Sequence, residues 1–385
     1  MVILAIETSC DETAASVTSE RRVLGNAVYS QVLIHKKWGG VVPSLAKRAH
    51  EERIDFVIEE ALRKFALTNK ILAGPAATFP PASARKKLRA VGSPSSRVTH
   101  QNFINATTSY IDHIAVTYGP GLAIALEVGI NKAKELAIRY NKKVIPVNHM
   151  EGHIYSCFTQ NSRGNPKRPF RFPYLTLLVS GGHTELVLFK DHITYQILGE
   201  TVDDAAGEAL DKAAKMLGLG YPGGPVIERL SQEVKNKDFY LLPRPMIQSK
   251  DLNFSFSGLK TSLFYLLKKK GKEKARRHIR ELASSFQEAV FDSIVKKTET
   301  AIRQTGINRI VVGGGVSANY NLRTRLRALT EKYRGSVIFP PYPYLCGDNA
   351  AMVGVAAYYR AKKGQFLKNL GRLDRVPRLR LGESK

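Results

Sequence analysis

Residues 2–20, VILAIETSCDETAASVTSE, decide the fold expected of this chain, because they read as a strand, a tight turn and a second strand. Residues 173–191, PYLTLLVSGGHTELVLFKD, repeat this pattern with small and hydroxyl residues again at the turn. Glycine-rich turns of this kind expose backbone N–H groups that can hold phosphates. Because each hairpin opens one half of the chain, the two together predict a duplicated α/β architecture with a cleft between its halves.

The residues around these hairpins alternate between helical and strand patterns, which predicts an α/β fold with mixed sheets. Apolar residues recur at spacings of three and four in the segments expected to be helices, which are 45–65, 127–140, 205–217 and 281–304. Short apolar runs predict buried strands ahead of glycine-rich turns at 113–119 and 309–315.

The chain is expected to divide into three parts. An N-terminal α/β domain is expected at 1–147 and a C-terminal α/β domain at 148–348. Residues 349–385 are expected to form a closing helix and a basic tail, with the helix packing on the N-terminal domain.

The chain is strongly basic, since 59 Lys and Arg against 33 Asp and Glu give a formal net charge of +26. Residues 70–111 contain six basic residues and no acidic one, 268–280 contain eight against one, and 360–385 contain nine against two. A single run of this kind is often only a solvated face, but three of them favour a polyanionic partner. No RRM, KH or zinc-knuckle pattern occurs, so the basic residues predict a folded RNA-binding surface.

The remaining composition is that of a globular protein in a reducing compartment. The 385 residues are 43% hydrophobic and 24% charged, which allows two domains with their own cores. No run of 18 apolar residues predicts a membrane span, and the first strand begins at Val2, which leaves no room for a targeting peptide ahead of it. Cys10, Cys157 and Cys346 are few and scattered, so we expect a cytoplasmic protein.

The first basic stretch interrupts the alternation of helices and strands. Residues 71–109 are rich in Ala, Pro and Ser and contain no acidic residue. This composition predicts an inserted loop whose basic residues are available to RNA.

Residues 148–156, NHMEGHIYS, place two histidines four positions apart. Residues at this spacing lie about 40° apart around a helix, so His149 and His153 can point at one metal ion. Glu151 lies about 200° around and faces away. A metalloprotease helix needs the glutamate directly after the first histidine, where this chain has Met150. The spacing weakens the protease interpretation and leaves either a metal site or two histidines on an ordinary helix face.

A third metal ligand is available in CGDNAAMVGVAAYYR, residues 346–360, which leads into an apolar helix. Asp348 is either the N-cap of that helix or a hard oxygen ligand on the loop before it. A catalytic metal needs three protein ligands and open positions for substrate, and the set of His149, His153 and Asp348 would supply them.

Two glycine turns offer polar groups to a ligand. In GGGVSAN, residues 313–319, Asn319 either caps the following helix or hydrogen-bonds a ligand. GYPGGP, residues 220–225, follows a helix that carries Asp211, which either receives ribose hydroxyls or pairs with Lys215 one turn later.

Taken in order, these motifs resemble the tRNA N6-adenosine threonylcarbamoyltransferase family, formerly called the glycoprotease or O-sialoglycoprotein endopeptidase family. The stretches that carry the resemblance are ETSCDET, GGVVPSLAKRAH, GPGL, NHMEGH, LLVSGGHTEL, GETVDDAAGEALDKAAKMLGLGYPGGP, NFSFSGLKTS, SSFQEAV, GGGVSAN and CGDNAAM. The resemblance covers nearly the whole chain except residues 70–111 and the tail after about residue 365.

The resemblance implies a fold, a reaction and a set of site residues. The fold is the two-domain actin/Hsp70/sugar-kinase-like fold around a nucleotide cleft. The reaction moves threonylcarbamoyl from threonylcarbamoyl-AMP to the exocyclic amine of adenosine 37 in ANN-decoding tRNAs and releases AMP. The family's metal, given as Fe2+ with Zn2+ also reported, has its ligands at His149, His153 and Asp348. Its adenylate-binding residues fall at Leu178, Val179, Ser180, Gly181, Gly182, Asp211, Gly224 and Asn319.

This chemistry agrees with the residues present. An adenine amine is a weak nucleophile, so the acyl carbon must be activated by AMP and held in line. A metal would orient the threonylcarbamoyl group, and N–H groups of the SGGH turn would stabilise developing charge. Asp11 and Glu12 are candidates for positioning the amine or taking its proton, although such a turn also caps itself. Cys10 is not expected to act as a nucleophile, because no histidine adjoins it in the motif.

Some features depart from the family's common pattern or leave alternatives open. Gly347 stands where the family more often has threonine, which removes a hydroxyl beside Asp348. The basic insertion and tail either enlarge the tRNA footprint or, for the insertion, cover a partner's docking surface. Relatives act with a paralogous subunit and a small ATPase, or as a homodimer, and the sequence allows both. A zinc metalloprotease, an ATPase of the same fold and a noncatalytic tRNA scaffold are the competing functions, and the complete ligand set favours the transferase.

Overall fold

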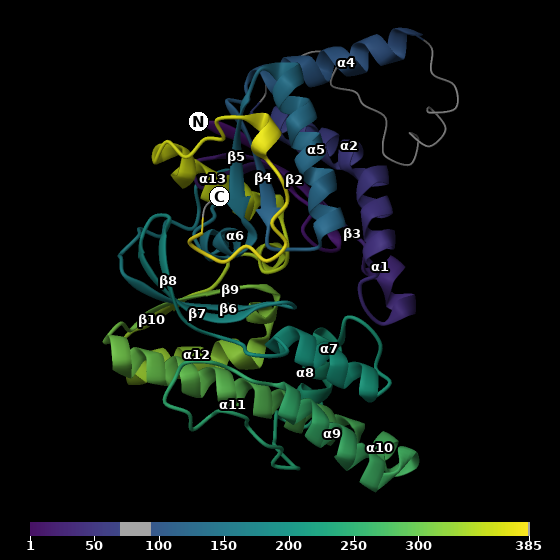
Figure 1. The fold of residues 1–385 in the computed structure, drawn as a ribbon, viewed down its shortest axis with the longest axis vertical. Helices are drawn as coiled ribbons and strands as arrows, with labels where there is room; N and C mark the ends of the chain where they lie inside the picture. The colour runs from purple at the N-terminus through teal and green to yellow at the C-terminus, as the bar shows by residue number, and fades with distance from the viewer. Residues whose placement is uncertain (70–93, 384–385) are drawn as a thin grey trace.

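The computed structural model describes residues 1–69 and 94–383. The chain forms two lobes, drawn one above the other in Figure 1, and each is built around a five-stranded sheet. Among the described residues, no helix is long and apolar enough to cross a membrane.

The N-terminal lobe contains a mixed sheet with the strand order β3-β2-β1-β4-β5. Its strands are β1 (Val2–Glu7), β2 (Glu12–Ser19), β3 (Arg22–Ser30), β4 (His113–Gly119) and β5 (Lys143–Asn148). β2 pairs antiparallel with β1 and β3, whereas β1, β4 and β5 run parallel to one another. The carboxyl ends of the parallel strands therefore meet at one edge of the sheet, where ligands bind in open α/β sheets.

The C-terminal lobe repeats this sheet with the order β10-β9-β6-β7-β8. Its strands are β6 (Tyr174–Val179), β7 (Thr184–Asp191), β8 (Thr194–Glu200), β9 (Arg309–Gly313) and β10 (Ser336–Ile338). The hairpin strands are again antiparallel and the remaining pairs parallel, so every strand has a counterpart in the first sheet. This repetition confirms the predicted duplicated fold of the actin/Hsp70/sugar-kinase-like class.

Helices cover the outer face of each sheet. In the N-terminal lobe these are α2 (Pro43–Thr68) and α5 (Ala123–Tyr140), with α1 (Val32–His35), η1 (Lys36–Trp38) and α4 (Pro94–Ser109) beside them. In the C-terminal lobe they are α7 (Ala206–Met216), α8 (Gly223–Glu233), α9 (Ser257–Lys270), α10 (Lys272–Arg277), α11 (Ile279–Thr305) and α12 (Tyr320–Lys332). Apolar side chains of these helices and of the strands form one core in each lobe.

Two helices lie between the sheets, as Figure 1 shows: α6 (His149–Ser156) and α13 (Ala350–Lys362). Their apolar side chains share one core with Ile3 and Ala5 of the first sheet and with Leu178 and Val311 of the second. α13 packs on β1, β2 and β5 as well as on α6, and α6 also contacts β6 and β9. A side chain at the end of the layer formed by α6 and α13 therefore lies close to both lobes.

The residues after α13 return along the N-terminal lobe, and we refer to 363–383 as the C-terminal strap. Its Leu373 and Leu379 are buried in the core of the N-terminal lobe. The N–H of Val376 donates to the carbonyl of Tyr118 at 2.7 Å, and the N–H of Gly121 donates to the carbonyl of Pro377 at 3.1 Å. The strap therefore forms part of the N-terminal lobe.

All four predicted helices are present, as α2, α5, α7 and α11, and the predicted hairpins and buried strands are present as well. The loop predicted for 71–109 is wrong for its second part, because Pro94–Ser109 form α4. Phe103, Thr107 and Thr108 of that helix are buried, which stabilises it against the lobe. Residues 70–93 of the predicted loop lie outside the described residues.

Candidate metal and adenylate site

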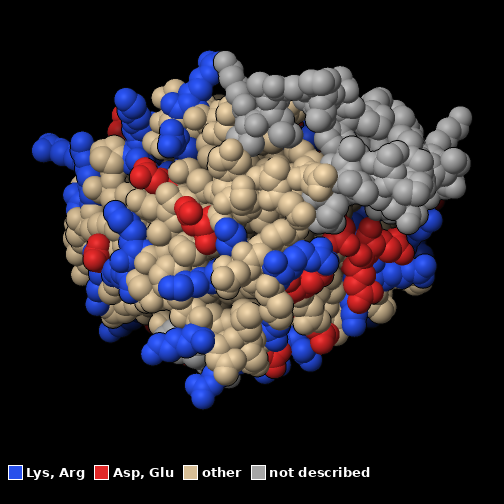
Figure 2. Space-filling model, turned by 90° about the horizontal axis from the view of Figure 1, so that it is seen from above, with Lys and Arg blue, Asp and Glu red and all other residues tan. Residues whose placement is uncertain are grey.

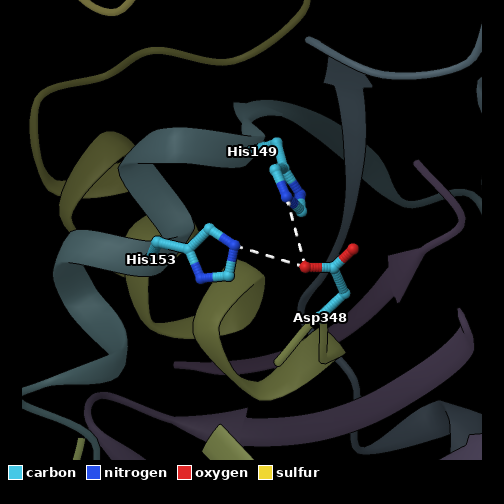
Figure 3. A group of neighbouring side chains, drawn as sticks. All are labelled: His149, His153 and Asp348. Carbon is cyan, nitrogen blue, oxygen red and sulfur yellow. Dashed lines mark ion pairs between the residues drawn. The ribbon is translucent and has the colours of Figure 1, made fainter. Parts of the chain in front are cut away.

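Helix α6 presents two histidines to the junction of the lobes (Figure 3). The side chain of Asn148 caps the helix, accepting from the N–H groups of Met150 and Glu151 at 2.8 and 3.4 Å. The cap fixes where the helix begins, and His149 and His153 then lie one turn apart with ring centroids 4.7 Å from each other. Both side chains are buried, at 9% and 0% exposure.

Asp348 reaches the same point from the loop before α13. Its Oδ1 lies 3.4 Å from His149 Nε2 and 3.2 Å from His153 Nε2. The N-cap of α13 is Asn349, whose side chain accepts from the N–H of Met352, so the N-cap role considered for Asp348 is wrong. Because the neighbouring asparagine satisfies the helix end, the Asp348 carboxylate is left to face the two imidazoles.

Glu7, at the end of β1, holds His149 from the side away from Asp348. Its Oε2 lies 3.1 Å from His149 Nδ1 and accepts from the Thr117 hydroxyl at 2.6 Å, while Oε1 accepts from the N–H of Ser9 at 2.6 Å. When the imidazole is neutral, a carboxylate that accepts from Nδ1–H fixes the tautomer in which Nε2 carries the free lone pair. Nε2 is the atom of His149 that faces Asp348.

The charges of this cluster shift one another's pKa values. Burial lowers the pKa of His149, but Asp348 and Glu7 outweigh it and raise that pKa well above its ordinary value. Burial raises the pKa of Asp348, but His149 and His153 outweigh it and hold that pKa far below its usual range. The carboxylate is therefore ionised throughout the physiological range and is ready to bind a cation.

The three side chains fit a divalent metal. Their ligand atoms lie within 4.8 Å of one another. Two ligands at about 2.0–2.1 Å from a tetrahedral ion lie about 3.4 Å apart, close to the two separations between imidazole and carboxylate atoms. Within the described residues, neither ring nitrogen of His153 forms a hydrogen bond of good geometry, although both are buried and Nε2 lies 3.2 Å from Asp348 Oδ1. A buried nitrogen in this situation is unfavourable unless something else binds it. Two imidazoles and one carboxylate suit Fe2+ or Zn2+.

Glu151 takes no part in this cluster. It forms a two-point ion pair with Arg360 of α13, with Nε–Oε1 at 2.6 Å and Nη2–Oε2 at 3.1 Å. The two side chains are 1% and 7% exposed. A glutamate held in this way on the opposite face of α6 cannot serve as the general base of a metalloprotease, which agrees with the spacing argument from the sequence.

The turn between β1 and β2 lies beside His149, His153 and Asp348, which we call the metal-ligand cluster. His50 of α2 fixes this turn, since its Nε2 donates to the carbonyl of Cys10 at 3.0 Å and its Nδ1 accepts from the Thr13 hydroxyl at 2.8 Å. Burial, and then the charges of Asp11 and Asp348, raise the pKa of Glu12 to about 10. Burial, with the same two charges, also raises the pKa of the Cys10 thiol, which disfavours the nucleophilic thiolate.

Asp11 connects this turn to the C-terminal lobe. The Tyr221 hydroxyl, from the GYPGGP turn, donates to Asp11 Oδ2 at 3.4 Å. Burial, and then the charge of Asp11, raise the pKa of that hydroxyl. The acidic turn of one lobe and the glycine turn of the other therefore lie on opposite sides of the same junction.

The SGGH turn between β6 and β7 adjoins the metal-ligand cluster from the C-terminal lobe. The Ser180 hydroxyl accepts from the N–H of His183 at 3.1 Å, and burial, followed by the charges of His149 and His153, lowers the pKa of His183 to about 4. A Cβ added at Gly181 or Gly182 would meet no atom within 4 Å, so both backbones are open to a ligand.

Glycines behind this turn allow close packing of backbone. A Cβ at Gly313 would lie 2.5 Å from the carbonyl oxygen of His153, and one at Gly314 would lie 2.3 Å from the carbonyl oxygen of Val179. Leu178 and Val179 are fully buried, so neither exposes a side chain to an adenylate.

The other predicted adenylate-binding residues have local partners as well. Asp211 Oδ1 accepts from the N–H groups of Gly223 and Gly224 at the start of α8, at 2.7 and 3.3 Å, in place of the ion pair considered with Lys215. Asn319 caps α12 by accepting from the N–H of Leu322 at 3.1 Å, which is one of its two predicted roles.

Sequence reasoning missed three residues of the site: Glu7, Ser9 and Thr117, which orient His149. The one available signal was an acidic residue at the end of the apolar strand VILAIE. A fully buried carboxylate needs polar partners. A glutamate at the end of an apolar strand therefore indicates that other polar side chains, such as those of a functional site, lie next to it.

Comparisons with known proteins match this chain to one family along most of its length. A family model described as tRNA N6-adenosine threonylcarbamoyltransferase matches residues 22–84 and 97–355. Relatives that carry this name occur in Thermosipho africanus, with 41% identity over 99% of this chain and 100% of the relative, and in Kosmotoga olearia, with 42% identity over 95% of each. A third, from Clostridioides difficile, is 40% identical over 100% of this chain and 99% of its own.

Two solved structures resemble the chain more distantly. The activator of a 2-hydroxyisocaproyl-CoA dehydratase from Clostridium difficile, with bound ADPNP, has a TM-score of 0.47 at 12% identity and covers 95% of this chain and 97% of its own. HypF from T. kodakarensis has a TM-score of 0.49 at 13% identity and covers 71% of this chain and 44% of its own.

Proposed function

The chain belongs to the tRNA N6-adenosine threonylcarbamoyltransferase family, and from this premise we propose that it moves the threonylcarbamoyl group from threonylcarbamoyl-AMP to the exocyclic amine of adenosine 37 in ANN-decoding tRNAs, releasing AMP. The observation that carries the proposal is the convergence of His149, His153 and Asp348 between an acidic turn and a glycine turn. Each of the two lobes supplies one side of this junction.

One divalent metal, Fe2+ first and Zn2+ second, is proposed at His149, His153 and Asp348. When bound, it would orient the threonylcarbamoyl group and polarise its acyl oxygen. The buried Glu7 carboxylate supports the site by holding His149 in the tautomer that leaves Nε2 free.

The adenylate is proposed to lie along the C-terminal lobe. The open backbones of Gly181 and Gly182 can approach its phosphate, and Ser180 holds that turn in shape. Asp211 retains one carboxylate oxygen for ribose hydroxyls while the other caps α8. The proposed adenylate residues are Leu178, Val179, Ser180, Gly181, Gly182, Asp211, Gly224 and Asn319.

The acidic turn is proposed to receive the adenine amine. The amine must lose a proton as it attacks, and Asp11 and Glu12 are the carboxylates that the acidic turn offers to receive it. Because the pKa of Glu12 is raised to about 10, this carboxyl group is protonated at neutral pH and can accept a proton only after a bound cation lowers its pKa. The bond between the acyl carbon and the AMP oxygen breaks as the new bond to nitrogen forms, and AMP leaves.

Protein partners are proposed as well, either a paralogous subunit with a small ATPase or a second copy of this chain. The transfer reaction itself tests the function. Purified protein, with and without such partners, is incubated with threonylcarbamoyl-AMP and unmodified tRNA, and the modified adenosine is measured by mass spectrometry. We expect product in at least one of these conditions, and no product in any of them would refute the assignment.

The metal assignment has a separate test that does not depend on activity. We expect His149→Ala and Asp348→Ala to reduce bound metal to background, as measured by elemental analysis after exchange into metal-free buffer. His278→Ala is the matched control, because this histidine is 49% exposed and away from the cluster. Full metal content in both site variants would overturn the assignment.

A further inference from the structure

The two basic stretches that the structure describes, 268–280 and 360–383, use their charges differently. In the last stretch, four basic residues are held by carboxylates of the protein itself, namely Arg360 by Glu151, Lys363 by Asp191, Arg375 by Glu127 and Arg380 by Glu200. On the end of the N-terminal lobe shown in Figure 2, Lys and Arg side chains that are not covered by grey atoms are dispersed among other residues. The paired charges of the last stretch are neutralised within the fold, and its exposed unpaired residues, Lys362, Lys368, Arg372 and Arg378, lie several positions apart along the chain.

Helices α9 and α10 differ from both of these regions. Six exposed basic side chains there have no ion-pair partner within the described part of the chain, and we call them the α9–α10 basic cluster: Lys268, Lys269, Lys272, Lys274, Arg276 and Arg277. Glu273 is the one acidic residue among them. In Figure 1 the two helices form the end of the C-terminal lobe farthest from the N-terminal lobe, so this charge projects into solvent.

Ala275 packs α10 against the core of the C-terminal lobe, but packing does not explain the charged side chains of this helix. None of the six residues of α10 is buried, and five of them are charged. Cations in the last turn of a helix interact favourably with the helix dipole, but this effect is weak for charges exposed to solvent. Six like charges without counterions repel one another, so a ligand that supplies several negative charges would relieve this repulsion.

Two aromatic side chains extend the cluster along α9. Phe264 and Tyr265 are 53% and 62% exposed, with ring centroids 5.6 Å apart. They precede Lys268 and Lys269 by four residues, which places them on the same helix faces. Basic groups that contact phosphates beside exposed aromatic rings that stack on bases are typical of RNA-binding surfaces. An acidic protein surface would need the charges but not the rings.

We propose that the α9–α10 basic cluster binds the sugar–phosphate backbone of the tRNA substrate, and that Phe264 and Tyr265 contact an unpaired nucleotide beside it. This inference rests on the proposed function, since it takes tRNA as the substrate. The lobe that holds the activated adenylate then also holds part of the acceptor molecule, at a distance from the reacting amine.

A charge-neutralised variant tests the proposal in the full-length protein. Lys268, Lys269, Lys274 and Arg277 are all replaced by glutamine, and the affinity for unmodified tRNA is measured between low and physiological salt. Each lost phosphate contact reduces the slope of log K against log salt by about 0.7–0.9, so we expect a shallower slope and an affinity at least about tenfold lower near physiological salt. KM for tRNA should rise while kcat and KM for threonylcarbamoyl-AMP stay unchanged.

The tail offers a matched control with the same change in net charge. Lys362, Lys368, Arg372 and Arg378 are exposed and have no ion pair within the described residues. Their replacement by glutamine should change tRNA affinity by less than about twofold if the cluster is specific. An equal loss in both variants would mean that binding follows total charge and would overturn the proposal.

The aromatic residues are tested separately. Phe264→Ala with Tyr265→Ala should weaken tRNA binding without changing the salt slope, because stacking releases no counterions. If wild-type protein modifies tRNA but the neutralised variant keeps its KM for tRNA, the cluster does not bind tRNA, even if that variant loses a protein partner. If wild-type protein modifies no tRNA under any partner condition, the proposed function fails instead.

Discussion

Replacing Glu151 by glutamine separates a structural role for this residue from a catalytic one. The carboxylate forms two hydrogen-bonded contacts with Arg360, at 2.6 and 3.1 Å, and both side chains are almost fully buried. Glutamine keeps the shape but leaves the arginine charge without a counterion. Removing one partner of a buried ion pair destabilises a protein by about 3–5 kcal/mol. With an unfolding entropy of about 2.1 cal/mol/K per residue, a chain of 385 residues shifts by about 1.2 °C per kcal/mol, so we expect the midpoint of thermal unfolding to fall by roughly 4–6 °C.

The assay combines thermal unfolding with metal content and transfer rate below the unfolding temperature. Glu151 binds no ligand atom of the metal cluster, so metal content and rate per folded molecule should stay close to those of the wild type. Glu52→Gln is a matched control, because that carboxylate is 56% exposed and pairs with Arg48 at the surface. Its loss should change stability by no more than about 1 kcal/mol. Replacing both Glu151 and Arg360 by apolar residues of similar volume should recover most of the lost stability.

One result would refute this reasoning. If Glu151→Gln unfolded at the wild-type temperature but lost its activity, the residue would be acting in catalysis. The protease interpretation of HMEGH would then regain its support, and the ion pair with Arg360 would be a minor contributor to stability.

Three further predictions follow from buried groups near the site. Glu7→Gln removes the carboxylate that orients the first metal ligand, so metal affinity should fall about 10–100-fold in a chelator competition, and unchanged affinity would contradict this role. Burial raises the pKa of Glu185 to about 7, so its contribution to stability is complete below the ordinary value of 4.5 and is lost as the pH rises through about 7. Glu185→Gln should therefore be more stable than the wild type at pH 8, by up to about 3 kcal/mol, and about equal to it at pH 4, as thermal unfolding at the two pH values will test. Gly313→Ala would place a methyl group 2.5 Å from the carbonyl oxygen of His153 and should cost about 1–3 kcal/mol and lower the metal content, whereas Gly315→Ala, with nothing within 4 Å, should do neither.

Local patterns were enough to predict the repeated part of the fold. The two hairpins and the long amphipathic helices have strong periodicity, and all of them are present. Strands β5 and β10 were not predicted, since β5 contains a proline and β10 has only three residues. Strands β3 and β8 were not predicted either, because β3 contains glycine, asparagine and serine and β8 contains polar residues, so neither reads as a continuous apolar run. β3 and β8 can be recognised only once the two hairpin strands of their sheet are placed, because each is the third strand beside that hairpin.

The convergence of His149, His153 and Asp348, the proposed metal ligands, could be predicted only in part from the sequence. The helical spacing of His149 and His153 is local information, but the approach of Asp348 depends on α13 packing between the sheets. The choice between an N-cap and a metal ligand at Asp348 was open in the sequence, since an asparagine that can cap the helix follows it directly. The role of Glu7 could be seen only in the folded structure, because its partners His149 and Thr117 lie far from it along the chain.

The C-terminal strap and α13 have a consequence for how the protein is made. β1 and β2 are synthesised before α13 and the strap, yet one of their faces is covered by α13, and the loop after β4 is held by residues 376 and 377. The N-terminal lobe therefore cannot complete its core on the ribosome until α13 and the strap emerge, although domains generally fold in the order of their synthesis. A premature stop ahead of α13 would leave unfinished a lobe whose sheet had been translated long before.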